Sequence, residues 1–395
     1  NGVHSIDIVS DNELLIAQYD GAISYWKKNK KGWRCRDVFR IHSGWVWKVQ
    51  HYKIKDDLYF ISCSYDGTLK CTNAKTGCSN TLIYDRSHKP ILDFDNANKM
   101  DSVYAITDKS LYLWHNGTLK QYEFNLEKNW TEYNFRSVAI LEKDKPYIAV
   151  NIKLLNGKSQ SVIISWSINL TFKHEIDVES TCDYVRCLKI YDFSRFKLMV
   201  IGGNHDNEQY FSIYLFNEGN LEYKGSFALD DRDILNHPTF ISDGRTYQGN
   251  SNVDCFNTSK HGAVNDIFVQ CNTETDKDEK YSFILYAVYK DGTMACYNVT
   301  VEAHKTNISD AYHPCSTVGS QPMCISGTNS IVVIGLLDGD VIIIDNGKYP
   351  TDIHFHTYAN LTTSVAVKLK NADLGSDTQK EAFKKNFAGY FNFDF

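Results

Sequence analysis

The stretch Tyr59–Gly77 reads YFISCSYDGTLKCTNAKTG and contains the pattern that decides the fold. An apolar segment leads into Asp66-Gly67, and a segment of alternating apolar and polar residues follows. Asp and Gly tolerate the positive φ angles of a tight turn. The stretch therefore predicts two antiparallel strands joined as a hairpin.

The same pattern recurs along the whole chain. Its copies are Leu14–Trp26, Tyr59–Gly77, Val103–Gly117, Tyr147–Trp166, Leu198–Asn217, Phe283–Asn298 and Ile331–Gly347. The second strand of each copy closes on Trp26, Thr72, Trp114, Trp166, Phe216, Tyr297 or Ile344. Most closing positions are about 40–50 residues apart, which is the period of a propeller blade. Only the step from Phe216 to Tyr297 is much wider.

Further strands are predicted on both sides of these hairpins. Those before them are Val3–Val9, Val46–Tyr52, Ile91–Asp95, Phe135–Glu142, Tyr184–Tyr191, Val264–Gln270 and Pro322–Ser326. Those after them include Arg36–Ile41, Leu119–Phe124 and Leu221–Ala228. Seven units of four antiparallel strands, with no helices between them, are typical of an all-β propeller.

Composition narrows the class of protein further. The chain has 395 residues, of which 43% are hydrophobic, so it can bury a large core. Its apolar runs are too short to cross a bilayer, and we find no signal peptide, so no membrane insertion is expected. The formal net charge of −6 argues against a surface built throughout for nucleic acid.

The cysteines indicate the compartment. The chain has 11 of them, none spaced as CxxC or as part of a zinc-binding Cys/His cluster. Scattered thiols of this kind are typical of a reducing environment. We therefore expect an intracellular protein, cytoplasmic or nuclear, without a metal or other cofactor.

In its second unit the sequence resembles the WD40-repeat family. His42-Ser43-Gly44-Trp45-Val46-Trp47 is similar to the family's loop before a blade, and Ser62–Gly67 to its inner hairpin turn. The resemblance implies a structural network of hydrogen bonds inside the blade, formed by His42, Ser62 and Asp66. Thr72-Asn73 replaces the family's Trp-Asp pair. The sixth unit keeps His261 and Asp291 at matching positions, and the likeness extends over about residues 1–358.

Two segments lie outside the repeat. Residues 230–260 are polar and rich in turn residues, which predicts an exposed insertion between blades 5 and 6 of a propeller over 1–371. Thr362–Lys370 would be a surplus strand, so the way the ring closes stays open. Residues 372–395 predict a short amphipathic helix from a capping box at Thr378, followed by an aromatic tail. Phe391, Phe393 and Phe395 either pack on the propeller or anchor a partner.

A basic stretch is predicted as a loop between two strands of the first blade. Its cations and aromatic residue are Lys27, Lys28, Lys30, Lys31, Trp33, Arg34 and Arg36. Such a stretch could grip phosphates and stack a base, or bind an acidic protein. More often it is simply solvated and protects a sheet edge.

No linear catalytic motif is present: we find no GxSxG, Walker A, HExxH or GxGxxG pattern. The sequence therefore favours a non-catalytic interaction scaffold, a subunit of a larger complex that binds protein partners. The expected contacts are the loop with His42, Trp45 and Trp47, the 230–260 insertion and the tail. The alternatives are a hydrolase with its site in the channel mouth and an RNA-associated subunit that uses the basic stretch, because propellers can build sites without a linear motif.

Overall fold

The computed structural model covers the whole chain and describes most of the repeat region. The described residues are 2–54, 56–96, 102–124, 129–142, 145–166, 173–176, 184–193, 195–205, 208–217, 220–228, 240–242, 245–247, 264–271, 281–290, 293–301, 306–316, 320–345 and 354–358.

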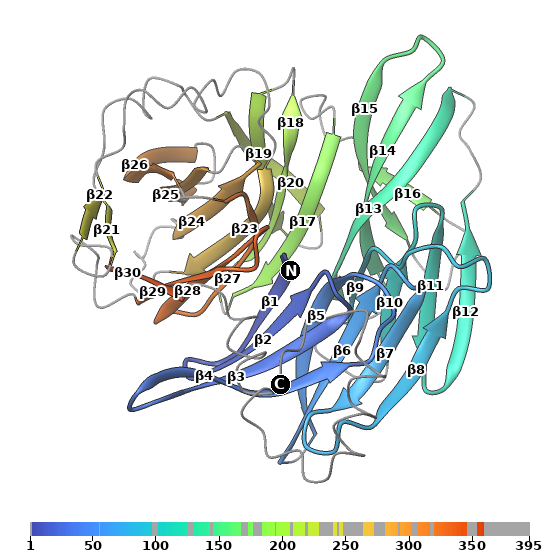
Figure 1. Cartoon of the computed structure of the whole chain (residues 1–395). Coiled ribbons are helices and arrows are strands. Elements are labelled where there is room, and N and C mark those ends of the chain that lie inside the picture. The colour runs from blue at the N-terminus through green and yellow to red at the C-terminus, as the bar shows by residue number, and fades with distance from the viewer. Residues whose placement is uncertain are drawn as a thin grey trace.

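The strands form seven sheets arranged around a common axis, each with four antiparallel strands (Figure 1). Blades 1 and 2 contain β1 (Val3–Ser10), β2 (Glu13–Gln18), β3 (Ala22–Asn29), β4 (Gly32–Arg40), β5 (Val46–Ile54), β6 (Asp57–Ser64), β7 (Thr68–Asn73) and β8 (Ser79–Tyr84). Blades 3 and 4 contain β9 (Asp93–Asp95), β10 (Ser102–Ile106), β11 (Ser110–His115), β12 (Thr118–Glu123), β13 (Trp130–Glu142), β14 (Lys145–Leu154), β15 (Ser159–Trp166) and β16 (Lys173–Ile176).

The remaining blades follow the same order. Blades 5 and 6 contain β17 (Tyr184–Asp192), β18 (Lys197–His205), β19 (Glu208–Asn217), β20 (Asn220–Ala228), β23 (Val264–Cys271), β24 (Tyr281–Tyr289), β25 (Thr293–Val301) and β26 (Thr306–Ser316). Blade 7 contains β27 (Pro322–Gly327), β28 (Ile331–Leu336), β29 (Val341–Asp345) and β30 (His354–Tyr358). The prediction of seven four-stranded units is confirmed, and every closing residue lies on the third strand of its blade.

The tight turns form where the sequence predicts them. Gly67, in the Asp-Gly turn of blade 2, has φ of 78°, and Gly21 in blade 1 has φ of 80°. These left-handed conformations strain a residue with a Cβ atom, which explains why Gly occupies both positions.

The hydrophobic core is divided among the seams between blades. Each of the seven apolar clusters combines side chains from two neighbouring blades. Phe60 of blade 2, for example, packs with Leu15 and Ile23 of blade 1. A blade buries its apolar faces only against its neighbours, so the ring stabilises itself as a whole.

The ring closes by packing of side chains between blades 7 and 1. Val3 and Ile6 of β1 join Cys324 and Val333 of blade 7 in one buried cluster. A Cβ atom on Gly335 would lie 2.4 Å from the Val3 side chain, so glycine permits this close approach. Within the described ranges, each blade has four consecutive strands of its own, and no strand is exchanged across this seam.

Two segments differ from their predicted form. Within residues 230–260, the structure describes β21 (Phe240–Ser242) and β22 (Arg245–Tyr247), and β21 pairs in parallel with β30 at the outer edge of blade 7. The basic stretch is a hairpin of β3 and β4 in place of a loop, with Lys30 and Lys31 at its turn. The surplus strand over 362–370 and the C-terminal helix and tail lie outside the described residues.

Candidate functional site

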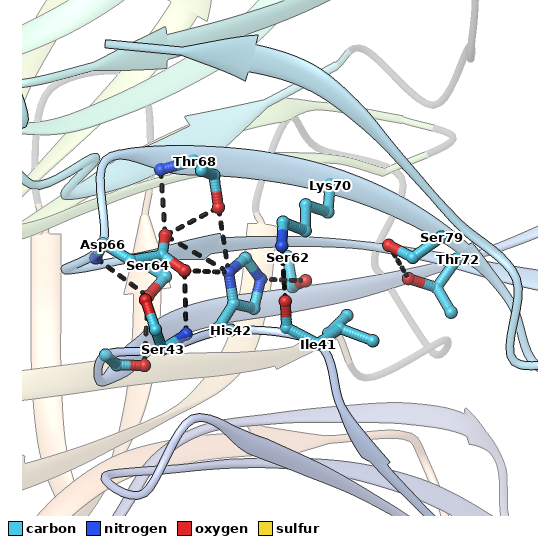
Figure 2. Close-up of polar contacts among 11 residues, drawn as sticks. Ile41, His42, Ser43, Ser62, Ser64, Asp66, Thr68, Lys70, Thr72 and Ser79 are labelled. Carbon is cyan, nitrogen blue, oxygen red and sulfur yellow. Dashed lines mark hydrogen bonds and ion pairs between the residues drawn. The ribbon is translucent and has the colours of Figure 1, made fainter. Parts of the chain in front are cut away.

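A chain of polar side chains crosses the interior of blade 2 (Figure 2). His42 Nε2 lies 2.8 Å from Ser62 Oγ, and His42 Nδ1 lies 3.1 Å from Asp66 Oδ2. Thr68 Oγ1 donates to Asp66 Oδ1 at 2.6 Å, and the Ser43 backbone N–H donates to Asp66 Oδ2 at 3.0 Å. The network ties the loop before the blade to its inner hairpin.

The Ser–His–Asp geometry of this network resembles that of a hydrolase triad, but its burial gives it a structural role. Ser62 has no exposed surface. The adjoining cavity of about 640 Å³ is lined by His42 and Asp66 but not by Ser62. Burial also lowers the pKa of His42, although Asp66 raises it. A nucleophile must reach its substrate, so this serine cannot act as one.

Blades 1 and 6, which also carry residues of the WD40 pattern, are stabilised by other contacts. In blade 1, Trp26 is buried and donates its Nε1–H to Ser24 Oγ at 2.9 Å. In blade 6, the hydroxyls of Tyr289 and Tyr297 lie 3.2 Å apart. His261 and Asp291 lie outside the described residues, so their predicted network stays a prediction.

The first strand of every blade faces a central channel of about 570 Å³. In six blades this strand contains a β-bulge, where one extra residue is inserted. The inserted residues are His4, Trp47, Arg136, Arg186, Asn265 and Met323, and all of them line the channel. Because a bulge redirects a side chain, these residues form a ring at one mouth of the channel.

Deeper in the channel, charged groups bridge neighbouring blades. Lys48 Nζ of blade 2 lies 2.8 Å from Asp93 Oδ1 of blade 3, and Lys189 Nζ of blade 5 lies 2.7 Å from Asp266 Oδ1 of blade 6. Asp93 also accepts from the Val138 N–H of blade 4 at 3.0 Å. Burial disfavours the charge of Lys48, but Asp93 and Asp95 raise its pKa. These groups are committed to holding the ring together.

The mouth has a cationic side formed by blades 4 and 5. The Arg136 guanidinium lies 4.9 Å from the centroid of the Tyr184 ring, and Arg186 Nη1 donates to Asn265 Oδ1 at 2.7 Å. Among the described residues neither arginine forms an ion pair, and Arg136 Nε is buried without a hydrogen-bond partner. Two cations therefore face the channel without a neutralising carboxylate.

The opposite side of the mouth, on blades 1 and 2, is aromatic. The rings of His4 and Trp47 have centroids 4.4 Å apart, and those of Tyr19 and Trp45 lie 5.0 Å apart. Trp45 also contacts Tyr65 at 5.6 Å. We call these five residues the aromatic rim. Trp45 and Tyr65 are 45% and 53% exposed, which is unusual for such large side chains in contact with one another.

Polar atoms of the rim also lack partners. Within the described residues, His4 Nε2 and Trp47 Nε1 are buried without a hydrogen bond, as is Gln50 Oε1 further along the channel wall. Burial lowers the pKa of His4 to about 4, so its imidazole is neutral at pH 7. Buried polar groups are rarely left unsatisfied. In the described part of the chain, three such atoms, on His4, Trp47 and Arg136, lie at this mouth.

The basic hairpin lies at the opposite end of blade 1 from the aromatic rim, because β3 runs from the rim side to the hairpin turn (Figure 1). Lys27 forms an ion pair with Glu13, and Arg36 Nε lies 3.6 Å from Asp37 Oδ2. Trp33 is buried in the seam with blade 7, so it cannot stack a nucleic-acid base as the sequence suggested. Part of the charge of the hairpin is thus compensated, and Lys28 lies 6.0 Å from the Trp33 ring.

The sequence pointed to only part of this mouth. Trp45 and Trp47 were identified through their loop, and the structure brings them together with His4, Tyr19 and Tyr65. Arg136 and Arg186 had no signal, because nothing in one sequence shows which residue of a strand is bulged. Phe391, Phe393 and Phe395 lie outside the described residues.

Other kinds of site have little support in the described part of the chain. Burial raises the pKa of the Cys63 and Cys324 thiols and raises that of Cys71 to about 11, so these cysteines stay protonated at neutral pH. No cluster of His, Cys, Asp and Glu suited to a metal occurs among the residues described. No described helix has the length and apolar character needed to cross a membrane.

The comparison of this protein with solved structures supports the fold. No family model and no curated protein matches the sequence. The structure, however, is similar to the crystal structure of the WD40 β-propeller domain of Doa1, with a TM-score of 0.54 and 14% sequence identity. The match covers 88% of this chain and 93% of that domain. In its described residues the protein is therefore an all-β, seven-bladed propeller whose fold is similar to that of this WD40 domain.

Proposed function

We propose that this protein is an intracellular, non-catalytic interaction scaffold that binds protein partners through the aromatic rim, as a subunit of a larger assembly. The observation that carries the proposal is the exposed contact of Trp45 with Tyr65 and Tyr19 beside the channel. Large aromatic side chains dominate the binding energy of protein interfaces, because they bury much area at a low cost in entropy.

The distribution of exposed apolar residues supports the same face. Of the seven large hydrophobic residues most exposed in the described chain, Trp45, Tyr65, Tyr84, Leu155 and Leu337 lie at the end of the blades where each first strand begins. Propellers of the WD40 type commonly act as interaction scaffolds, which is consistent with such a face.

The test is affinity capture of the full chain from its native cells, followed by mass spectrometry. The Trp45→Ala/Tyr65→Ala double variant should lose the stoichiometric partners of the wild type. Leu119→Ala removes a large apolar side chain that is 43% exposed at the opposite end of the blades, so it should retain them. Partners that survive the double variant, or no partners at all, would refute the proposal. A chain ending at Lys370 would show whether the tail contributes an anchor.

A further inference from the structure

We infer that the channel mouth binds a peptide segment in which an acidic residue lies next to an aromatic or large aliphatic residue. The carboxylate would be bound by Arg136 and Arg186, and the apolar side chain would pack on the aromatic rim. This inference rests on the proposed function and defines the chemistry of its partner.

The charges of the channel support an anionic ligand. Each carboxylate that lines it is engaged within the protein: Asp7 with His51, Asp93 with Lys48, Asp95 with the Ile140 N–H, and Asp266 with Lys189. The two arginines have no such partner among the described residues, and both lie on bulges that direct them to the mouth. A carboxylate would complete the pairing that the fold leaves open, by charge-assisted hydrogen bonds.

The unsatisfied donors support the same ligand. Arg136 Nε–H and Trp47 Nε1–H can only donate, so each needs an acceptor. Because both atoms are buried in the unbound protein, a backbone carbonyl or a carboxylate of a bound peptide supplies one when these side chains shift on binding. The contact of the Arg136 guanidinium with the Tyr184 ring restrains this side chain, which lowers the entropy lost on binding.

The positions of the two groups define the segment. The aromatic rim is on blades 1 and 2 and the arginines are on blades 4 and 5, so they face each other across the channel. A ligand that uses both must present an apolar and an acidic side chain within a short distance. A peptide meets this need with neighbouring residues.

A nucleic acid fits the same surface less well. Its recognition requires cations that follow a long run of phosphates. Among the described residues, the channel is lined by two arginines and by Lys48 and Lys189, which pair with aspartates. The basic hairpin is at the other end of blade 1 and cannot extend the track. The whole chain also carries a net charge of −6.

The test uses fluorescein-labelled heptapeptide pools and the full-length protein. Each pool fixes Glu, Gln or Lys beside Phe and randomises the other positions, and binding is followed by fluorescence anisotropy. Charge-assisted hydrogen bonds predict that the Glu pool binds about tenfold or more tighter than the Gln pool. The Lys pool should bind weakest.

Protein variants locate the effect. Arg136→Gln and Arg186→Gln should each remove most of the preference for Glu over Gln, and Arg136→Lys should restore part of it. Lys158→Gln removes an exposed charge on blade 4 that does not line the channel, so it should leave the preference unchanged. The comparison of pools on the wild type needs no variant, so it stands even if a variant unfolds.

Other outcomes would overturn the inference. They are equal binding of the three pools, no binding of any pool, a preference that survives both arginine variants, or tighter binding of a decauridylate than of the Glu pool. If native partners still depend on Trp45 and Tyr65 in the capture experiment, such a result refutes only the inference that the partner presents an acidic residue. If that dependence is absent as well, the proposed function fails too.

Discussion

Blades 1 and 2 are neighbours that fill equivalent positions of their sheets in different ways, blade 2 with hydrogen-bonded polar side chains and blade 1 with a large apolar one. Blade 2 uses the polar network of His42, Ser62 and Asp66, with Thr72 where a large closing residue is usual. Blade 1 has Trp26 at that position and Ile16 in place of the serine, and its turn residue Asp20 pairs with Arg40 at 3.2 Å. The comparison teaches that a blade must fill the space between its strands and its neighbour and must satisfy the polar groups buried there. Either a polar network or a large apolar side chain can do so.

The largest effect on stability is expected when Trp26, the apolar side chain of blade 1, is removed. Trp26→Ala should lower the free energy of unfolding by about 3–5 kcal/mol, because it removes a side chain that is 2% exposed from the seam with blade 7. Urea unfolding followed by fluorescence and circular dichroism would measure it. Trp26→Phe, which retains a ring, should cost clearly less; equal losses would mean that packing is not what Trp26 contributes.

Disrupting the polar network of blade 2 should cost less stability, and a second substitution should restore part of the loss. His42→Leu should cost about 2–3 kcal/mol, because Ser62 and one oxygen of Asp66 lose their buried partner. Adding Ser62→Ala removes one stranded group and makes blade 2 more like blade 1. The double variant should therefore be more stable than His42→Leu alone in the same assay. If the second change adds a further loss, the network is not a closed polar unit.

The smallest effect concerns the seam between these two blades and depends on pH. His51 Nδ1 of blade 2 lies 2.8 Å from Asp7 Oδ2 of blade 1, and this bond raises the pKa of His51 even though burial lowers it. The raised folded pKa adds stability that is complete below the unfolded value of 6.5 and is lost as the pH rises through the folded value.

The expected readout is the difference in unfolding free energy between the wild type and His51→Gln, measured from pH 5.5 to about pH 9 across the titration range of histidine. The wild type should lose its advantage as the pH rises. Among the described residues, the exposed His88 of blade 2 contacts the Tyr84 hydroxyl, so His88→Gln provides a control that removes an imidazole without breaking the His51–Asp7 pair. A constant difference for His51→Gln would mean that the ion pair contributes nothing.

Much of the fold could be read from the sequence because the repeat is local. The strand predicted over Val46–Tyr52 is β5 (Val46–Ile54), and that predicted over Pro322–Ser326 is β27 (Pro322–Gly327). Alternation and Asp-Gly turns depend on a few adjacent residues, so they survive the loss of the Trp-Asp pairs. The pairing of β21 with β30 joins segments more than 100 residues apart and had no local signal.

The candidate site was harder to predict for a related physical reason. The mouth assembles single residues from separate blades, such as His4 and Arg136, which the ring alone brings together. The inward direction of these side chains also depends on bulges, which a sequence pattern of period two does not contain. The loop of Trp45 and Trp47 was found because its neighbouring His42 belongs to a local motif.

The closure of the ring has a consequence for biosynthesis. Val3 and Ile6 of blade 1 find their final cover only in blade 7, which begins at Pro322. At ribosomal rates of 5–20 residues per second, the intervening chain takes roughly 15–60 s to emerge. During that time the apolar face of blade 1 that blade 7 later covers is exposed and prone to aggregation. Chaperones that hold nascent chains are expected to guard this flank until the last blade docks.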